Sequence, residues 1–188
     1  MSKIDINNLT GKCLVSMPDV SGDLARSVVY ICSHSKDGAM GFVINNRIKE
    51  FSFSDLITEL PLNLKDKGLH VNLYNGGPLE KSKGFILHSD DYKSNDSLNV
   101  GDGIMVSSSI DILKDIANGN GPKQRIIVLG YLGWGPNQLE NEIKNNVWII
   151  TNASPNIVLS SADNDKWSTA MASLGINHNN FTANYGHS

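Results

Sequence analysis

The stretch SVVYICSHSKDGAMGFVIN, Ser27 to Asn45, combines two runs of β-branched and aromatic residues with a short polar, glycine-containing turn. Such residues favour strands, because they pack well on a pleated sheet. We therefore expect strands at Val28–Cys32 and Met40–Ile44, joined as a hairpin. Since side chains alternate along a strand, Cys32 and His34 are expected on the same face.

The rest of the chain alternates short strands with short helices. Strand patterns occur at Cys13–Met17, His70–Tyr74, Gly84–His88, Ile104–Ser108, Arg125–Leu129 and Val147–Thr151. Capping residues and helical spacing predict helices from Ser52 to before Pro61, over Ile110–Ala117, over Gln138–Asn145, and from Asp163 or Asn164 to Leu174. Because strands come in runs of two or three between helices, the pattern favours a mixed, largely antiparallel α+β fold over a doubly wound parallel sheet.

The composition is that of one globular domain over residues 1–188, with 40% hydrophobic and 19% charged residues. The net charge is −3 and the basic residues are scattered. A DNA-binding protein normally carries a basic patch, so direct DNA binding is not expected. The sequence has neither a signal-peptide core nor an apolar run of the ~20 residues that span a bilayer. We therefore expect a cytoplasmic protein without membrane contact, with flexible tails at about 1–10 and 177–188.

Cys32, His34 and His88 are the candidates for chemistry. A thiolate beside an imidazole is an effective nucleophile, which gives one hypothesis of a Cys/His enzyme. Against it, two residues along a strand separate Cys32 from His34 by about 7 Å, and no third residue is evident to orient the imidazole. The favoured interpretation is a buried thiol beside structural histidines. Neither CxxC nor HxH nor HxxxH spacing occurs, so no metal or cofactor is predicted.

Two further segments could contribute to a binding site. The turn at Gly76 and Gly77 could offer backbone N–H groups to an anion, but it lacks a phosphate-loop context, which favours a tight structural turn. Tyr131, Trp134 and Gln138 follow a predicted buried strand and precede a helix, a position where pockets often open. The alternative is that both rings cover the core beneath the helix. We consider this second segment the better candidate for binding.

Four segments have a specific order and spacing along the chain. They are Met17-Pro18 with SVVYICSH and GAMGFVIN, then GGPLEKSKGFILH, then GYLGWGPNQLENEI, then NNVWIIT followed by the Trp167 helix. Together they resemble the AlgH/YqgE family of bacterial proteins over nearly the whole chain. The resemblance implies a compact fold in which a bifurcated sheet closes into a pseudo-barrel with helices packed outside. It also implies a cytosolic protein of uncharacterised biochemistry, with some members named as candidate transcriptional regulators, notably of alginate production.

The sequence departs from the pattern of that family at a few places. Family members usually carry Phe at Leu24, Lys-Pro at Asn46-Arg47 and Gly at Asn137. Asparagine tolerates the left-handed backbone region better than most residues, so the last change is compatible with the same turn. These departures leave the expected fold unchanged, and they weaken the case for a strictly fixed function of the loops concerned.

The favoured function is that of an AlgH/YqgE-like protein, a candidate transcriptional regulator that binds a protein partner or a small ligand and is not an enzyme. The alternative is a hydrolase or transferase, which requires the Cys/His side chains to converge within about 4 Å at a reachable hollow. No catalytic residue is assigned, and neither ligand nor oligomeric state follows from the sequence. The candidate binding residues are Cys32, His34, Gly76, Gly77, His88, Tyr131, Trp134 and Gln138.

Overall fold

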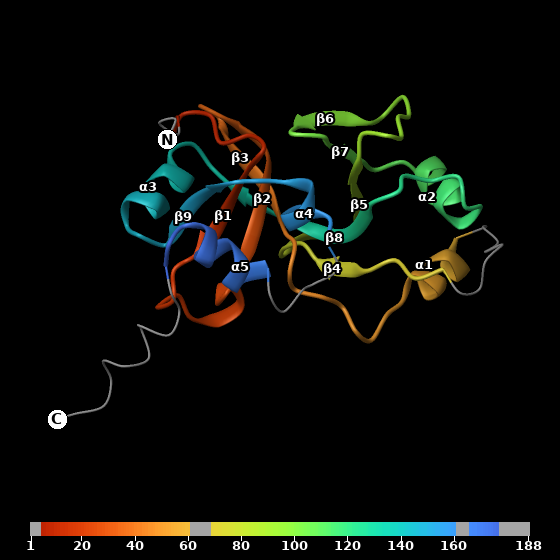
Figure 1. Ribbon diagram of the computed structural model, residues 1–188, viewed down its shortest axis with the longest axis horizontal. Coiled ribbons are helices and arrows are strands. Elements are labelled where there is room, and N and C mark those ends of the chain that lie inside the picture. The colour runs from red at the N-terminus through yellow and green to blue at the C-terminus, as the bar shows by residue number, and fades with distance from the viewer. Residues whose placement is uncertain (1–4, 61–68, 161–165, 177–188) are drawn as a thin grey trace.

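The computed structural model describes residues 5–60, 69–160 and 166–176, which form one curled sheet with helices around it (Figure 1). The strands are β1 (Lys12–Ser16), β2 (Val28–Ser35), β3 (Gly38–Val43), β4 (Leu73–Asn75), β5 (Leu79–Ser89), β6 (Leu98–Gly101), β7 (Ile104–Ser107), β8 (Arg125–Trp134) and β9 (Trp148–Asn152). The helices are α1 (Phe53–Glu59), α2 (Ile110–Ala117), α3 (Gln138–Lys144), α4 (Pro155–Val158) and α5 (Lys166–Ser173), with a 3-10 turn η1 (Gly22–Leu24).

The sheet is largely antiparallel. Its strands are hydrogen-bonded in the order β6-β7-β5-β8-β3-β2-β1-β9, and β4 pairs with β8 away from this path. The pairing of β4 with β8 is parallel, and the other described pairings are antiparallel. The predicted mixed, largely antiparallel class is therefore confirmed.

The segment from Ser27 to Asn45 forms the hairpin that its residues predict. β2 and β3 pair antiparallel, with Tyr30 opposite Phe42 and Ser35 opposite Gly38. The apolar residues at the start of β2 are all buried, as expected for β-branched and aromatic side chains in the middle of a sheet covered on both faces. The hairpin is confirmed, although β2 runs further than Cys32.

Strand β8 is the junction at which the sheet divides. Its first half pairs with β4 on one side and β5 on the other, whereas its last residues pair with β3. The change of partner occurs around Gly130, whose φ of 71° lies in the left-handed region that favours glycine. Figure 1 shows β8 connecting the half that contains β1, β2, β3 and β9 with the half that contains β5, β6 and β7. The strand predicted to end at Leu129 therefore continues to Trp134.

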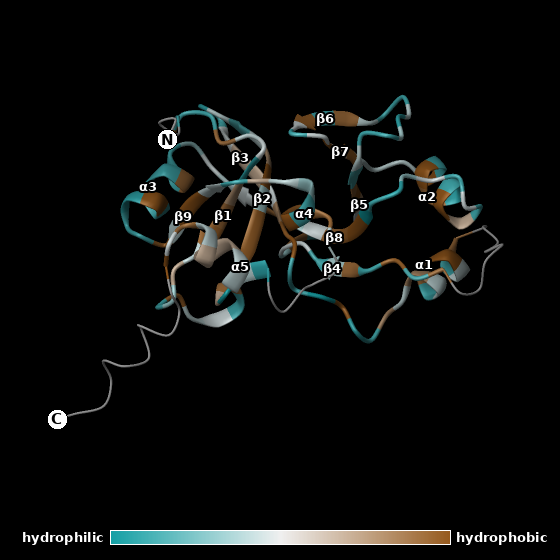
Figure 2. Cartoon of the chain, in the orientation of Figure 1, coloured by the Kyte–Doolittle hydropathy of each residue, from teal (hydrophilic) through white to brown (hydrophobic). Residues whose placement is uncertain are grey.

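Apolar side chains on both faces of the sheet are buried beneath the helices. Figure 2 shows the hydrophobic residues, in brown, concentrated on the strands. On β8, Ile127 faces the cluster beneath α1 and α2, whereas its neighbour Val128 faces the central cluster that contains Trp167 of α5. A third cluster brings Leu139 of α3 against β1, β2 and β9. In the part of the chain described, no helix is long and apolar enough to cross a membrane.

Several boundaries differ from those predicted. Leu9 and Thr10 do not belong to a flexible tail, because Leu9 is fully buried and the Thr10 hydroxyl accepts the His34 backbone N–H at 3.0 Å. The capping box of Ser52 and Asp55 is present at the start of α1. Helix α4 and strand β6 were not predicted. The predicted start of the last helix at Asp163 or Asn164, and the predicted tail over 177–188, lie outside the described residues.

Candidate functional site

A β-bulge separates the two side chains that the hairpin was expected to bring together. The pairing of β2 with β3 shifts between Ile31 and Ser33, so Cys32 is an extra residue in β2. Beyond the bulge the alternation of faces is reversed. Cys32 packs against the central cluster with Tyr30, whereas His34 turns towards the N-terminal segment and α3. The prediction that Cys32 and His34 share a face is therefore wrong.

His34 links three parts of the chain through both ring nitrogens. The Leu9 backbone N–H donates to Nδ1 at 3.1 Å, so the ring proton lies on Nε2. Nε2 then donates to Oε1 of Glu140 in α3 at 3.0 Å. The His34 side chain is 1% exposed. His34 thus fixes the N-terminal segment and α3 to β2, and neither nitrogen is directed at Cys32.

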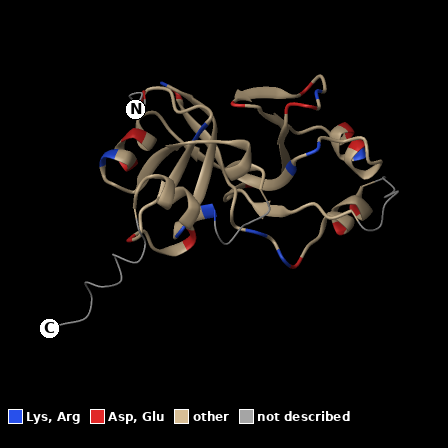
Figure 3. Ribbon diagram, in the orientation of Figure 1, with Lys and Arg blue, Asp and Glu red and all other residues tan. Residues whose placement is uncertain are grey.

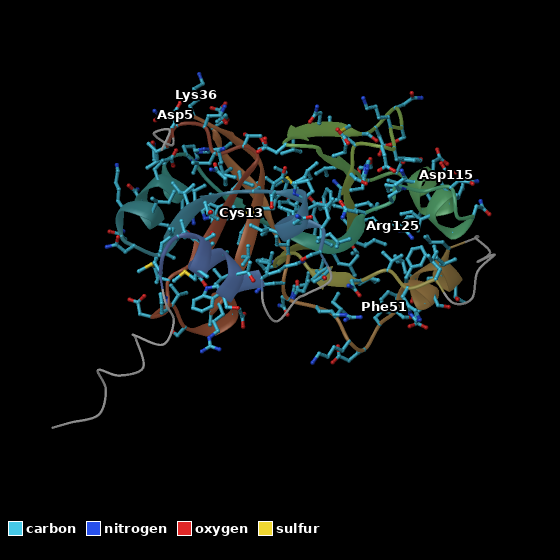
Figure 4. All side chains as sticks on the ribbon, in the orientation of Figure 1. Asp5, Cys13, Lys36, Phe51, Asp115 and Arg125 are labelled. Atoms are coloured by element: carbon cyan, nitrogen blue, oxygen red, sulfur yellow. The ribbon has the colours of Figure 1, made fainter. Side chains whose placement is uncertain are left out.

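Burial makes the thiol of Cys32 a weak nucleophile. It raises the pKa of Cys32 to about 11, and it raises that of the fully buried Cys13, labelled in Figure 4, to about 12. The thiolate is the reactive form of cysteine, so at neutral pH very little of either residue is reactive.

Alkylation of Cys32 in the Cys13→Ala variant tests this environment. At pH 8 a thiol with a pKa of about 11 is roughly one part in a thousand thiolate, compared with about a quarter for an ordinary thiol. We expect the native protein to react with iodoacetamide about two hundredfold more slowly than the urea-unfolded protein. The native rate should rise about tenfold per pH unit from pH 8 to 10, whereas the unfolded rate levels off. A native rate within a few fold of the unfolded rate at pH 8, followed by mass spectrometry, would contradict the burial.

His88 lies in a separate buried network. Its Nδ1–H donates to the Ser89 carbonyl at 2.9 Å, so its Nε2 accepts from the Ser107 hydroxyl at 3.0 Å. Burial lowers the pKa of His88. The described hydrogen bonds give His88 and His34 no common partner, and the Cys/His convergence that the enzyme hypothesis requires is not seen. Among the described residues, no group of three or more His, Cys, Asp or Glu side chains could hold a metal ion.

At the turn of Gly76 and Gly77, the backbone before β5 packs closely against the backbone of β8 at the junction. The Gly76 N–H donates to the Leu129 carbonyl at 2.8 Å, and the Gly77 N–H donates to Oδ1 of Asn75 at 3.3 Å. A Cβ atom at Gly77 would collide with the carbonyl of Tyr131, and one at Gly76 with that of Gly130. Both N–H groups therefore have partners within the protein, and the close approach explains why this turn needs glycine.

Trp134 and Gln138 belong to the attachment of α3. Oε2 of Glu142 accepts the indole N–H of Trp134 at 2.9 Å and that of Trp148 at 2.7 Å. Oε1 of the same carboxylate accepts from Nε2 of Gln138 at 3.2 Å. The two indole rings meet edge to face with their centroids 6.5 Å apart. The two indole rings cover the core beneath α3, so the alternative interpretation of this segment holds for Trp134 but not for its other ring, that of Tyr131. Tyr131 lies apart from them and donates to Oε1 of Glu80 at 3.0 Å.

A pocket of about 430 Å³ opens where η1, the end of β3, the turn before β5, the start of β5 and the end of β8 meet. The only one of the eight candidate residues in its wall is Gly77. Leu24 and Asn46, two of the departures from the family pattern, both line it. Nothing in the spacing of these residues along the sequence marks them as neighbours. The lining residues are Asp23, Leu24, Val43, Asn46, Asn75, Gly77, Pro78, Lys81 and Leu132.

A second hollow of about 350 Å³ lies beside α1. It is lined by two segments, residues 47–54 and 69–73, and it includes Phe51, which is labelled in Figure 4. None of the eight candidate residues lies in it. The first pocket is therefore the hollow that adjoins the predicted site residues.

The protein thus belongs to the mixed α/β class. Its curled sheet is bifurcated, with the strand β8 shared between two halves and a pocket at their junction. A family model described as DUF179, AlgH-like, matches residues 13–179. The chain therefore belongs to the AlgH-like family, and the resemblance found in the sequence is confirmed.

Relatives and solved structures support the same assignment. A UPF0301 protein of Rhodospirillum rubrum is 41% identical over 181 residues, covering 95% of this chain and 94% of that protein. A UPF0301 protein of Ruegeria pomeroyi is 42% identical over 184 residues, covering 96% and 99%. The solution structure of the AlgH protein from Pseudomonas aeruginosa, 34% identical, covers both chains completely with a TM-score of 0.78. A Corynebacterium diphtheriae crystal structure, 22% identical, shares the fold with a TM-score of 0.72 over 92% of this chain and 90% of that chain.

Proposed function

We propose that this protein acts by binding a small ligand in the pocket at the β8 junction, and not by catalysis. The observation that carries the proposal is the pocket itself, whose volume of about 430 Å³ lies in the range typical of small-molecule sites. Its walls combine apolar side chains with a few polar ones, the usual composition of such sites. The partly buried Cys32 thiol, with its raised pKa, and the partnered His34 favour binding over nucleophilic chemistry.

A regulatory role, which the family resemblance suggests, would then be indirect. Lys and Arg residues are scattered over the described chain and mixed with acidic residues (Figure 3). Together with the net charge of −3, this supports action through a ligand or a protein partner without direct contact with DNA. A mobility-shift experiment at physiological salt is the test, and tight, salt-dependent binding to duplex DNA would refute this part of the proposal.

Ligand binding is tested by screening small polar metabolites individually by thermal shift and amide NMR. We expect at least one compound to raise Tm and to shift the amide signals of Gly77 and Leu132, which line the pocket. The variant Leu24→Trp should fill the pocket and abolish both effects. Leu98→Trp is the matched control, because Leu98 is 68% exposed on β6 and does not line the pocket. Binding that survives Leu24→Trp, or a screen in which no compound shifts these signals, would refute the proposal.

A further inference from the structure

We propose that the pocket at the β8 junction takes a zwitterion, a free amino acid or short peptide with an apolar side chain. Its ammonium would pair with Asp23 and its carboxylate with Lys81. This inference rests on the proposed ligand-binding function and names the chemical class of the ligand. The argument has three parts, which are the charges, the amides and the apolar floor of the pocket.

The pocket carries one acidic and one basic side chain from different parts of the chain. Asp23 comes from η1 and Lys81 from β5. In the described parts of the chain, neither side chain makes an ion pair or a hydrogen bond. The neighbouring Glu80 is different, because it pairs with Lys83 at 3.6 Å and accepts the Tyr131 hydroxyl. The charges of Asp23 and Lys81 are therefore available to a ligand.

The two opposite charges select against simpler ligands. An anion that approaches Lys81 meets the like charge of Asp23 in the same pocket, and a cation that approaches Asp23 meets that of Lys81. Both side chains are exposed, so solvent screens part of this repulsion, but it still disfavours ligands of a single charge. A molecule that carries both charges satisfies both residues. The charge pattern is thus complementary to a zwitterion.

Two asparagines add hydrogen-bonding groups on a fixed backbone. Asn46 and Asn75 both line the pocket, and the Asn75 N–H donates to the Asn46 carbonyl at 2.8 Å. Oδ1 of Asn75 accepts the Gly77 N–H at 3.3 Å, which leaves its NH₂ group to donate. Amide donors of this kind suit a carboxylate or a peptide carbonyl. Because the backbone is already fixed, little entropy is lost when a ligand binds.

The remaining wall is apolar. Val43 of β3 is buried, and Leu24 and Leu132 are partly buried against the same cluster. An apolar side chain of the ligand can cover this surface and remove it from water. The combination of apolar floor, two amides and two opposite charges is the recognition chemistry of an apolar amino acid or its peptide.

Four probes test the assignment by titration calorimetry and amide NMR on the full chain. The probes are L-leucine, L-leucyl-L-leucine, N-acetyl-L-leucine and L-leucinamide. We expect at least one of the two zwitterions, L-leucine and L-leucyl-L-leucine, to bind with saturation and to shift the Gly77 amide signal. Whichever binds more tightly shows whether the pocket prefers a free amino acid or a peptide. The acetylated probe lacks the ammonium and the amide probe lacks the carboxylate. Because Asp23 and Lys81 are exposed, each loss should weaken binding about two- to fivefold.

Variants that remove one charge from the pocket test which residue pairs with which end of the ligand. Asp23→Asn should weaken binding of the zwitterion about two- to fivefold and leave that of N-acetyl-L-leucine unchanged or tighter, because the repulsion of its carboxylate is removed. Lys81→Met should weaken the zwitterion similarly and leave L-leucinamide unchanged or tighter. Lys83→Met is the matched control, since Lys83 lies two residues along the chain and does not line the pocket, and it should leave all four affinities unchanged.

The outcomes separate this inference from the proposed function. Equal affinity for the zwitterion and its blocked forms, or no effect of Asp23→Asn and Lys81→Met, overturns the zwitterion. If the zwitterions fail while other compounds bind and lose affinity in Leu24→Trp, the inference is overturned and the proposed function stands. If no compound shifts the pocket signals, both are overturned.

Discussion

Replacing Gly130 with alanine is expected to destabilise the protein by about 2 to 5 kcal/mol. The φ of 71° at this position costs a residue with a Cβ about 1 to 2 kcal/mol. The new Cβ would also lie 2.6 Å from the Gly77 carbonyl oxygen and 2.7 Å from that of Leu79. Both are backbone atoms that cannot rotate away, so overpacking adds about 1 to 3 kcal/mol. The measurement is the urea midpoint at constant m-value, followed by circular dichroism.

Gly84→Ala is the matched control for this prediction. Gly84 lies in β5, which pairs with β8 beside the junction, but its Cβ would meet only the Leu129 side chain at an ordinary 3.7 Å. Alanine there should change the stability by less than about 1 kcal/mol, because the strand backbone accepts it without strain. Equal midpoints for the two variants would show that Gly130 is not the constrained point of the sheet.

Glu142→Ala is expected to cost about 2 to 4 kcal/mol and to loosen α3. The carboxylate accepts the indole N–H groups of both Trp134 and Trp148, and these two residues are 7% and 2% exposed. Hydrogen bonds to a charged group contribute about 1.5 to 3 kcal/mol each, and buried donors left without a partner are costly. We expect a lower urea midpoint together with a red shift of tryptophan emission, since water then reaches the rings.

Two further variants serve as controls for the effect of Glu142→Ala. Glu142→Gln keeps an acceptor oxygen but loses the charge, so it should show a smaller loss than Glu142→Ala. Glu80→Ala removes a half-exposed carboxylate, whose bond to the Tyr131 hydroxyl lies at the surface, and should cost less than about 1 kcal/mol. An emission maximum unchanged in Glu142→Ala would show that the indoles do not depend on this carboxylate.

Local patterns in the sequence predict the elements of this fold well. The branched and aromatic runs on either side of the turn at Gly38 specify the β2–β3 hairpin, and Ser52 and Asp55 mark the start of α1. These features depend on neighbours a few residues apart, which a single sequence displays directly. The β-bulge at Cys32 is different, because the register of β2 is set by β3 and by the clusters on its two faces.

The hydrogen-bond partners of the candidate site residues could not be predicted from local sequence patterns. His34 bonds to Leu9 and Glu140, which are 25 and 106 residues away in the chain. The pocket draws its walls from five separate segments, and its charged residues Asp23 and Lys81 stand in no recognisable motif. Such a site forms only when the sheet curls, so the spacing of these residues along the sequence does not predict it.

The sharing of β8 among three partner strands limits how the length of this chain can vary. A residue inserted before Gly130 would displace β8 against β4 and β5 together, and one inserted after it would displace β8 against β3. The number of residues in β5 is less constrained. Residues 80–83 stand opposite the single residue Gly130, between the pairs Leu79–Tyr131 and Gly84–Leu129. Additional or missing residues are therefore best tolerated at 80–83, on the rim of the pocket, while β8 keeps a constant number of residues.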